Sequence, residues 1–218
     1  MGKRPILPEQ RNYEQALSQA LQIAREKLSN SNVSDFCRNS GMAFTETPSG
    51  RVIALKYAGQ EIQVTLPHAE VLVSNGREKL PSRERLLVLH YLLSAKGRPL
   101  TNKLITLKEI PDGLNYLPTF TKRALKPLVD NFGQEPGRIV EIAGKIGGRK
   151  ADHGDAAATI DVFPRVPLTF VIWQGDTEFQ PDASILFDSS ITDYLPVEDI
   201  IVMSEITVWK LVNLSRNV

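Results

Sequence analysis

The stretch Pro81–Ala95 constrains the fold of this chain more than any other segment. Its interior, LLVLHYLL over 86–93, is apolar on nearly every side of a helix, whereas a surface helix shows a single apolar stripe. Ser82 can cap the start of this helix, and Gly97 followed by Pro99 can end it. We therefore expect a central buried helix over 81–95 that the rest of the chain surrounds.

Spacing of apolar residues and turn formers predicts the other elements. Helices are expected over 13–28, 33–40, 119–132, 139–146 and 193–214. Strands are expected over 51–57, 60–66, 104–110, 158–163, 168–174 and 184–187. Pro127 should kink or restart its helix, and Ser204 can cap a second segment of the last one. The pattern predicts one compact α+β domain over residues 1–218, with a small, mostly antiparallel sheet packed with helices.

Composition and cysteine content restrict the classes of protein that the chain can belong to. Apolar residues make up 42% of the 218 residues and charged residues 23%, which is ordinary globular usage. No apolar run approaches the ~20 residues of a membrane helix, and the N-terminus lacks a secretory apolar core, so a cytoplasmic location is expected. Cys37 is the single cysteine, so the chain's own cysteines can form neither a disulfide nor an iron–sulfur cluster.

The net charge of +1 conceals an uneven distribution. Residues 1–150 hold 23 Lys and Arg against 14 Asp and Glu, a net charge of +9, and residues 151–218 carry −8. The two parts can neutralise one another in one folded surface, or present a basic face to an anionic ligand beside an acidic face for a metal or a basic partner. The basic residues are not interleaved with aromatic ones, so the pattern does not favour nucleic-acid binding.

The first candidate site is the segment 171–188, VIWQGDTEFQPDASILFD, which reads as a hairpin with a tight turn at Gly175-Asp176. Carboxylates at strand ends can bind Mg²⁺ or Ca²⁺ or act as acid and base. The alternative is structural, because acidic residues favour turns and Asp188-Ser189-Ser190 can cap a following helix. The candidate site residues are Trp173, Asp176, Glu178 and Asp188.

The second candidate site is the loop 144–155, GKIGGRKADHGD, a glycine-rich cationic segment that can hold a phosphate or carboxylate with its backbone N–H groups. It fits neither the phosphate-binding loop of nucleotide-hydrolysing enzymes nor the dinucleotide fingerprint. Its histidine can join a metal or acid–base cluster, or be solvated only. The candidate ligand-binding residues are Lys145, Gly147, Gly148, Arg149, His153 and Asp155.

The remaining reactive side chains carry no recognised motif. Cys37 reads as a small, half-buried apolar residue, and His90 in the central helix as a satisfied core or interface histidine. The three histidines lack metal-ligand spacing, and no nucleophile motif accompanies any serine. The sequence therefore leaves an enzymatic function uncertain and does not favour it.

Several segments together resemble one uncharacterised prokaryotic family, a domain of unknown function common in anaerobes. The matching segments are LLVLHYLLSAKGRPL at 86–100, GLNYLPTF and PLVDNFG within 113–133, IGGRKADHGDAA at 146–157, FPRVPLTFVIWQGDTEFQPDASILFD at 163–188 and YLPVEDIIVM at 194–203. The resemblance implies an accessory role, because some similar proteins carry a cysteine-rich iron–sulfur segment or accompany corrinoid and methyl-transfer proteins. This chain departs from them in having only Cys37, and no catalytic residue is carried over.

Three functional hypotheses follow from these features. The first is a non-catalytic accessory protein that binds an anionic cofactor, or an iron–sulfur or corrinoid-type redox partner, near the loop 144–155 and the hairpin. The second is a Mg²⁺- or Mn²⁺-dependent enzyme in which Asp155, Asp176, Glu178 and Asp188 converge on the metal. The third is a purely structural subunit of an assembly.

Overall fold

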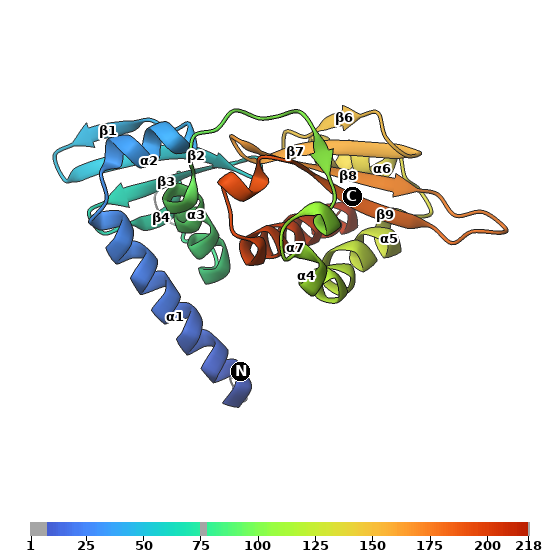
Figure 1. The fold of residues 1–218 in the computed structure, drawn as a ribbon, viewed down its shortest axis with the longest axis horizontal. Coiled ribbons are helices and arrows are strands. Elements are labelled where there is room, and N and C mark those ends of the chain that lie inside the picture. Colours follow the sequence, from blue (N-terminus) through green and yellow to red (C-terminus); the bar gives the residue numbers. More distant parts are fainter. Residues whose placement is uncertain (1–7, 75–77, 218) are drawn as a thin grey trace.

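The computed structural model describes residues 8–74 and 78–217, with side chains from residue 12 onward. The chain forms one α+β domain with two antiparallel sheets, each packed with helices, which confirms the expected fold class (Figure 1). The first half of the chain builds the four-stranded sheet and the second half the five-stranded sheet. The fold therefore has two parts, and the interface between them is the feature that positions the charged groups described below.

The first part combines a β-meander with three helices. The strands lie in the order β1-β2-β3-β4, and Tyr57 pairs with Gln60 across the expected Ala58-Gly59 turn. Asn32 caps α2 through a 2.9 Å hydrogen bond from the Ser34 N–H. In chain order the elements are α1 (Pro8–Ser29), α2 (Val33–Ser40), β1 (Phe44–Thr47), β2 (Gly50–Tyr57), β3 (Gln60–Leu66), β4 (Glu70–Val73) and α3 (Ser82–Ser94).

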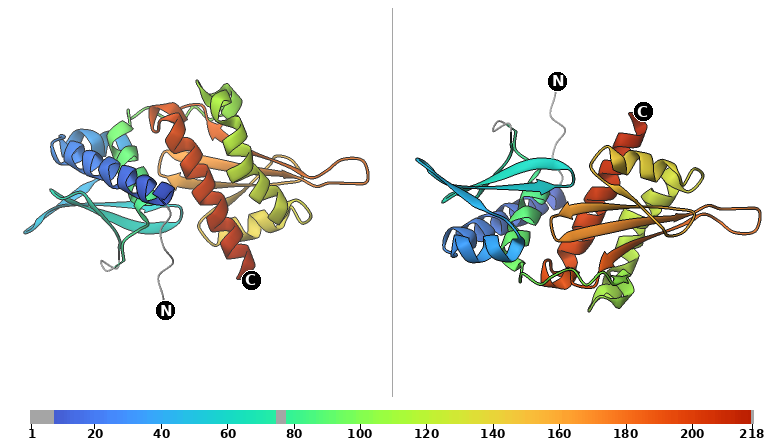
Figure 2. Two further views of the ribbon diagram at one scale, coloured as in Figure 1. Left: turned by 90° about the horizontal axis from the view of Figure 1, so that it is seen from below. Right: turned by 90° about the horizontal axis from the view of Figure 1, so that it is seen from above.

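The second part is a five-stranded sheet in the order β5-β9-β8-β7-β6, with α7 running beside α5 over one face (Figure 2). In chain order its strands are β5 (Leu104–Ile105), β6 (Arg149–Ala151), β7 (Ala156–Phe163), β8 (Val166–Trp173) and β9 (Asp182–Asp188). Its α-helices are α4 (Gly113–Phe120), α5 (Lys126–Phe132), α6 (Arg138–Gly144) and α7 (Val197–Arg216). Its shorter turns are η1 (Leu107–Glu109), the π-helical η2 (Thr121–Leu125) and η3 (Ile191–Asp193).

Helix α3 is the buried central helix that the sequence predicts. It packs against α1, α2 and α7, and five of its side chains are buried, including Tyr91 at 0% exposure. The Tyr91 ring stacks on Phe163 of β7 with ring centroids 4.2 Å apart. The two sheets also meet directly, because the Ala58 N–H donates to the Val162 carbonyl at 2.9 Å. The apolar surface of α3 therefore joins the two parts into one core.

Several boundaries differ from the expectations. Ser82 is the first residue of α3 and not its cap: it follows the cap residue Pro81, and its hydroxyl accepts a 2.7 Å hydrogen bond from Arg85. The helix expected over 119–132 begins at residue 113 as α4 and continues through the π-helical turn η2 into α5. Pro127 lies at the start of α5, directly after this π-helical turn. The strand expected over 104–110 is only two residues long, because η1 follows it. Ser204 caps nothing, since its hydroxyl donates to the Ile200 carbonyl inside the continuous helix α7.

Candidate functional site

The glycine-rich loop 144–155 is more ordered than the sequence suggests. Gly147 takes a positive φ of 77°, and the Gly148 N–H donates to the Ala143 carbonyl at 2.8 Å, which closes α6 as a helix C-terminus. Arg149 lies in strand β6, where its guanidinium contacts Asp161 of β7 at 2.8 Å. Lys145 lies 3.9 Å from Glu141 one turn earlier. Both predicted cations thus have carboxylate partners at the surface.

The hairpin of 171–188 forms, but with a longer turn than Gly175-Asp176 suggests. Trp173 pairs with Asp182, so residues 174–181 form the connection between β8 and β9. The Asp176 carboxylate accepts 2.7 Å hydrogen bonds from the N–H groups of Glu178 and Phe179, and these bonds lower its pKa. Figure 1 shows this hairpin extending away from the rest of the molecule. Asp176 therefore stabilises its own turn.

The loop and the hairpin meet at one end of the sheet. The Asp155 carboxylate accepts a 2.7 Å hydrogen bond from the Gln174 N–H, next to the half-exposed Trp173. His153 is exposed beside them. Asp188 lies at the opposite end of β9, six residues from Asp182 and thus roughly 20 Å away at strand spacing. The structure brings the loop and the hairpin base together and keeps Asp188 apart.

Asp188 is a structural carboxylate of the core. It is 3% exposed and accepts hydrogen bonds from the N–H groups of Thr101, Asn102 and Ser190 and from two hydroxyls. Burial alone raises the pKa of Asp188, but the hydrogen bonds from Ser190 and Thr101 hold it below its ordinary value. All of its partners belong to this chain. Asp188 therefore has the structural role that the sequence offered as the alternative to a metal or acid–base site: it caps the turn that follows β9.

The carboxylates proposed for a metal-dependent enzyme do not converge. Within residues 8–74 and 78–217, no group of three or more His, Cys, Asp or Glu side chains could hold a metal ion. Asp155, Asp176 and Asp188 are each engaged with separate backbone N–H groups. The geometry required by the second hypothesis is thus missing from the described residues.

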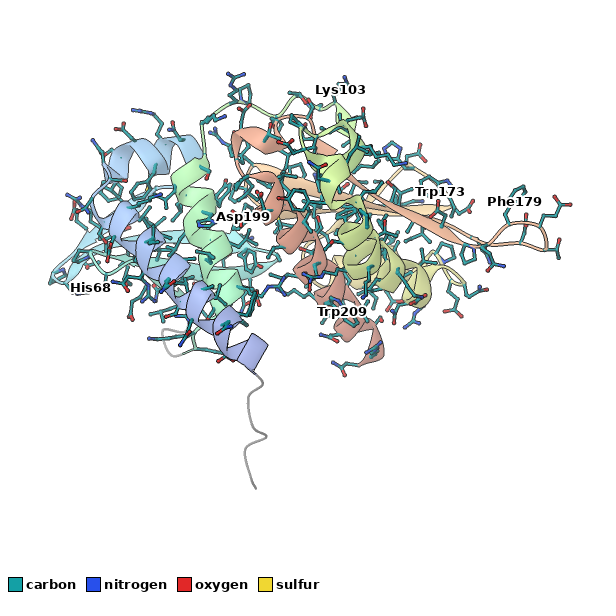
Figure 3. The ribbon with its side chains drawn as sticks, turned by 60° about the horizontal axis from the view of Figure 1, so that its bottom comes forward. His68, Lys103, Trp173, Phe179, Asp199 and Trp209 are labelled. Carbon is teal, nitrogen blue, oxygen red and sulfur yellow. The ribbon has the colours of Figure 1, made fainter. Side chains whose placement is uncertain are left out.

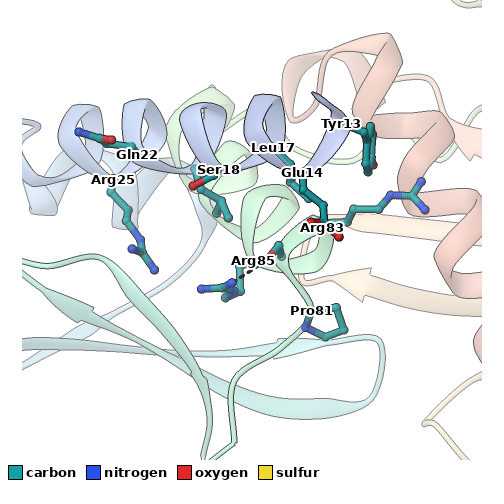
Figure 4. Close-up of a pocket in the computed structure, with 11 residues that line it drawn as sticks. Tyr13, Glu14, Leu17, Ser18, Gln22, Arg25, Pro81, Arg83 and Arg85 are labelled. Atoms are coloured by element: carbon teal, nitrogen blue, oxygen red, sulfur yellow. Dashed lines mark hydrogen bonds between the residues drawn. The ribbon is translucent and has the colours of Figure 1, made fainter. Parts of the chain in front are cut away.

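A cationic cavity that the sequence analysis did not identify lies between α1 and α3. Its volume is about 1050 Å³, and Figure 4 shows Arg25 reaching down from α1 and Arg85 projecting from α3 into the same space. Tyr13 and Glu14 stand at its other end on α1. The lining residues are Tyr13, Glu14, Leu17, Ser18, Leu21, Gln22, Arg25, Pro81, Ser82, Arg83 and Arg85.

Two guanidinium groups of this cavity are only partly satisfied. The Nε atoms of Arg25 and Arg85 are buried and have no hydrogen-bond partner among the described residues. Burial lowers the pKa of Arg85, and the charge of Arg25 lowers it further, which shows that the two cations lie within electrostatic reach of each other. Glu70, the acidic group that acts on Arg85 in the opposite sense, is itself 3.2 Å from Lys79.

Arg83 faces away from this pair. Its guanidinium forms hydrogen bonds of 3.2 and 2.8 Å to the two carboxylate oxygens of Glu205 on α7, and these raise its pKa. Figure 4 shows its side chain directed toward α7, on the side opposite Arg25. Arg83 thus joins the two parts of the fold, whereas Arg25 and Arg85 form no salt bridge with a carboxylate among the described residues.

A second group of buried titratable side chains lies where the two parts of the fold meet, beside a cavity of about 500 Å³. Burial raises the pKa values of Tyr57 and Glu84 and lowers that of Lys210. The Lys210 ammonium donates to the Ala58 carbonyl at 2.9 Å and lies 5.9 Å from the centre of the Tyr57 ring. The Tyr57 hydroxyl faces Glu84 outside hydrogen-bonding geometry. This group fastens α7 to β2 and α3.

One sequence signal could have identified the cationic cavity. Arg83 and Arg85 lie in the first turn of α3, where positive side chains oppose the helix dipole. Arginines at these positions therefore indicate a role outside the helix itself. Arg83 contacts Glu205 of α7, and Arg85 lines the cavity. Arg25 carries no comparable signal, because one arginine on an amphipathic helix is ordinary.

Comparison with known proteins places the chain in a family. Residues 32–210 match the family described as Domain of unknown function (DUF3786), and the chain belongs to it. The matched segment includes Arg85 and the loop and hairpin, and Arg25 on α1 lies before it. No curated protein and no solved structure matches the chain. Within the described residues, no helix has the length and apolar character to span a membrane.

Proposed function

We propose that this protein binds a small anionic ligand in the cavity between α1 and α3. The observation that carries the proposal is the pair of arginines Arg25 and Arg85, which line one cavity and whose buried Nε–H groups lack acceptors among the described residues. A buried donor without a partner costs about 1–3 kcal/mol, and more when it is charged. An anion between the two arginines supplies acceptors for both and offsets their mutual repulsion.

The chemistry of the cavity indicates a carboxylate or a phosphate. Guanidinium groups match both anions because their N–H donors lie in a planar fork. Ser18, Gln22 and Ser82 add neutral polar groups to the lining, and Tyr13 is a half-exposed aromatic side chain at one end. A volume of about 1050 Å³ holds a molecule larger than an inorganic ion. The ligand class is therefore an organic acid or a phosphate ester.

Titration calorimetry of the full chain with inorganic phosphate and with citrate tests this site. Charge-assisted hydrogen bonds contribute about 1.5–3 kcal/mol, and each 1.4 kcal/mol is tenfold in affinity. We expect Arg25→Gln and Arg85→Gln each to weaken binding of the preferred anion by about tenfold or more. The matched control is Arg51→Gln, which removes a surface arginine paired with Glu46 at 2.8 Å. Equal binding by all four proteins, or no binding by any, would refute the site.

The same titration examines the site predicted from the sequence. The double substitution Lys145→Ala with Arg149→Ala removes both cations of the loop 144–155. We expect little change, because Lys145 and Arg149 already face Glu141 and Asp161. A loss of affinity confined to this double variant would show that the anion binds at the loop 144–155 and not in the cavity.

We further propose that the β8–β9 hairpin contacts a protein partner. Its connecting loop carries Phe179, which is 69% exposed and follows the acidic Asp176 and Glu178, and Trp173 at its base is 41% exposed. Large exposed aromatics on a projecting hairpin favour a protein contact, and the acidic groups favour a basic partner surface. The iron–sulfur or corrinoid proteins named by the resemblance are the partners to examine first.

A binding assay against such purified partners tests the hairpin. Phe179→Ser removes the exposed ring, and we expect it to weaken binding by about tenfold, as for an aromatic interface residue. Leu114→Ser is the control, because Leu114 of α4 is a similarly exposed large apolar residue, at 62%, outside the hairpin. Unchanged binding by the Phe179 variant would exclude the hairpin as the contact.

A further inference from the structure

His90 of α3 and Asp199 of α7 form an oriented pair. The His90 Nδ1 lies 2.6 Å from the Asp199 Oδ2, and Asp199 is only 9% exposed. The two side chains come from different parts of the fold, joined where the N-terminus of α7 packs against α3. Figure 3 shows Asp199 between these two helices. The expected satisfied interface histidine is thus found, with one ring nitrogen occupied.

The contact with Asp199 determines which nitrogen of His90 carries the proton. When the Asp199 carboxylate is ionised it can only accept a hydrogen bond, so the tautomer of the neutral ring that fits this contact carries its proton on Nδ1. Nε2 then holds a lone pair, and His90 lines a cavity of about 910 Å³ between α1 and α3. The same division of roles between the two nitrogens makes a histidine a base or a nucleophile in hydrolytic enzymes.

The surroundings of His90 suit a polar, electrophilic group. This cavity is separate from the arginine cavity, with which it shares no lining residue. The charged groups in its wall are Glu26 and Lys27 of α1, and the hydroxyl of Ser94 lies one helical turn after His90. Lys27 and Asn30 provide N–H donors, and Ile23 and Leu93 provide apolar walls. The lining of this cavity therefore combines a histidine with N–H donors and apolar side chains.

We propose that His90 is a nucleophilic site for small acyl esters, positioned by Asp199. The Nε2 lone pair attacks the ester carbonyl carbon, and the bond to the leaving oxygen breaks with its electron pair on that oxygen, which takes a proton from solvent and leaves as the alcohol. The acyl group is then bonded to Nε2, and the Nδ1 proton stays with the Asp199 contact. Water adds to the acyl carbon, gives one proton to solvent, and releases the acid with Nε2 restored. The net reaction is ester plus water to acid plus alcohol.

Hydrolysis of p-nitrophenyl acetate by the full chain tests this proposal. The chain has three histidines, and the exposed His68 and His153 serve as references. We expect His90→Asn to lower the rate by about tenfold or more, in the range of acid–base and nucleophilic contributions. His68→Asn and His153→Asn should leave the rate within about twofold of the wild type. A rate that falls equally for all three, or that His90→Asn leaves unchanged, would overturn the proposal.

Asp199→Asn separates positioning from mere packing. The amide can donate as well as accept, so it no longer fixes the proton on Nδ1. We expect the ester rate to fall severalfold while circular dichroism remains that of the wild type. Carbethoxylation of the wild-type protein by diethyl pyrocarbonate gives a measurement that needs no variant: His90 should react faster than its partial burial predicts and no slower than His68. A His90 that stays unmodified while His68 and His153 react would also overturn the proposal.

Discussion

At the scale of single residues, buried charged groups differ in whether the described chain supplies their hydrogen-bond partners. The carboxylate of Asp188 accepts hydrogen bonds from Thr101, Asn102 and Ser190, so its charge is compensated inside the chain. The guanidinium groups of Arg25 and Arg85 are buried at Nε without such partners. A charged side chain at a strand or helix end is therefore informative only when its partners are known.

Asp188→Asn should destabilise the fold. The amide nitrogen that replaces one carboxylate oxygen cannot accept, so either the Asn102 N–H, which bonds Oδ2, or the Thr101 and Ser190 N–H groups, which bond Oδ1, lose their acceptor. A buried donor left unpaired costs about 1–3 kcal/mol. We expect a loss of roughly 2–4 kcal/mol in urea unfolding at pH 7. Asp130→Asn, which removes an exposed partner of Lys126 at 2.8 Å, should change stability by less than about 1 kcal/mol.

The effect of Asp188→Asn should also depend on pH. Because the hydrogen bonds hold the pKa of Asp188 below its ordinary value of 3.8, the wild type gains stability that is fully present above pH 3.8. That gain is lost as the pH falls through the lower folded-state pKa. The difference between wild type and variant should therefore shrink only in strong acid. A difference that is constant from pH 7 to pH 2 would contradict this assignment.

Glu84 should show the opposite dependence on pH. Burial raises its pKa above the ordinary value of 4.5, so the folded state favours the protonated carboxyl. The resulting stability is present below pH 4.5 and is lost as the pH rises through the folded-state pKa. We expect the stability of Glu84→Gln relative to wild type to increase over that window. A flat profile for Glu84→Gln would count against the burial argument.

At the scale of elements, the turn of one sheet docks against the other part of the fold. Gly59, between β2 and β3, has a φ of 79°, and a Cβ added there would lie 2.3 Å from the Ile146 carbonyl oxygen. Gly147, the next residue of that loop, has a φ of 77° with nothing within 4 Å of an added Cβ. The two glycines share a backbone conformation and differ only in their surroundings.

Gly59→Ala and Gly147→Ala therefore form a matched pair. The left-handed conformation alone costs a residue with a Cβ roughly 1–2 kcal/mol, so Gly147→Ala should lose about that much stability. Gly59→Ala should lose clearly more, because the Cβ also displaces the backbone at Ile146. Urea unfolding of both variants measures the difference. Equal losses of stability in the two variants would show that the β2–β3 turn at Gly59 does not pack tightly against Ile146 after α6.

Local patterns predict some elements well and others poorly. The range of α2, Val33–Ser40, is predicted correctly because Asn32 and Gly41 supply a cap at each end. The short strands β1, β4 and β6 have too few residues to show alternation and become strands only by pairing with their neighbours. The candidate site illustrates the same limit, since Arg25 and Arg85 lie far apart in the chain and only tertiary packing shows that they share a cavity.

At the scale of the whole molecule, contacts between the two parts explain why we expect one cooperative unit. Neutralisation of the basic and acidic parts of the chain, one of the two alternatives that the charge distribution allows, has an example here in the ion pair of Arg83 with Glu205 at 2.8 Å. The stacked rings of Tyr91 and Phe163 make the apolar component of the same interface. Neither sheet is complete as a separate core, because α3 packs against both α1 and α7.

Cooperative unfolding of the two parts is testable because both tryptophans, Trp173 and Trp209, lie in the second part. Their fluorescence reports on that part, and hydrogen exchange of the β2 and β3 amides reports on the first. We expect both signals to give the same free energy of unfolding within experimental error. A lower value for the first part would show that the chain contains two independently folding units.

Arginine side-chain NMR tests most directly whether an anion binds between Arg25 and Arg85. The Nε–Hε signals of individual arginines can be followed as phosphate or citrate is added to the full chain. We predict that the Arg25 and Arg85 signals shift together and saturate at one ligand concentration, while the signal of Arg51 stays in place. If the Arg25 and Arg85 signals do not move, or if all arginines shift alike with ionic strength, the cavity between α1 and α3 is not an anion site.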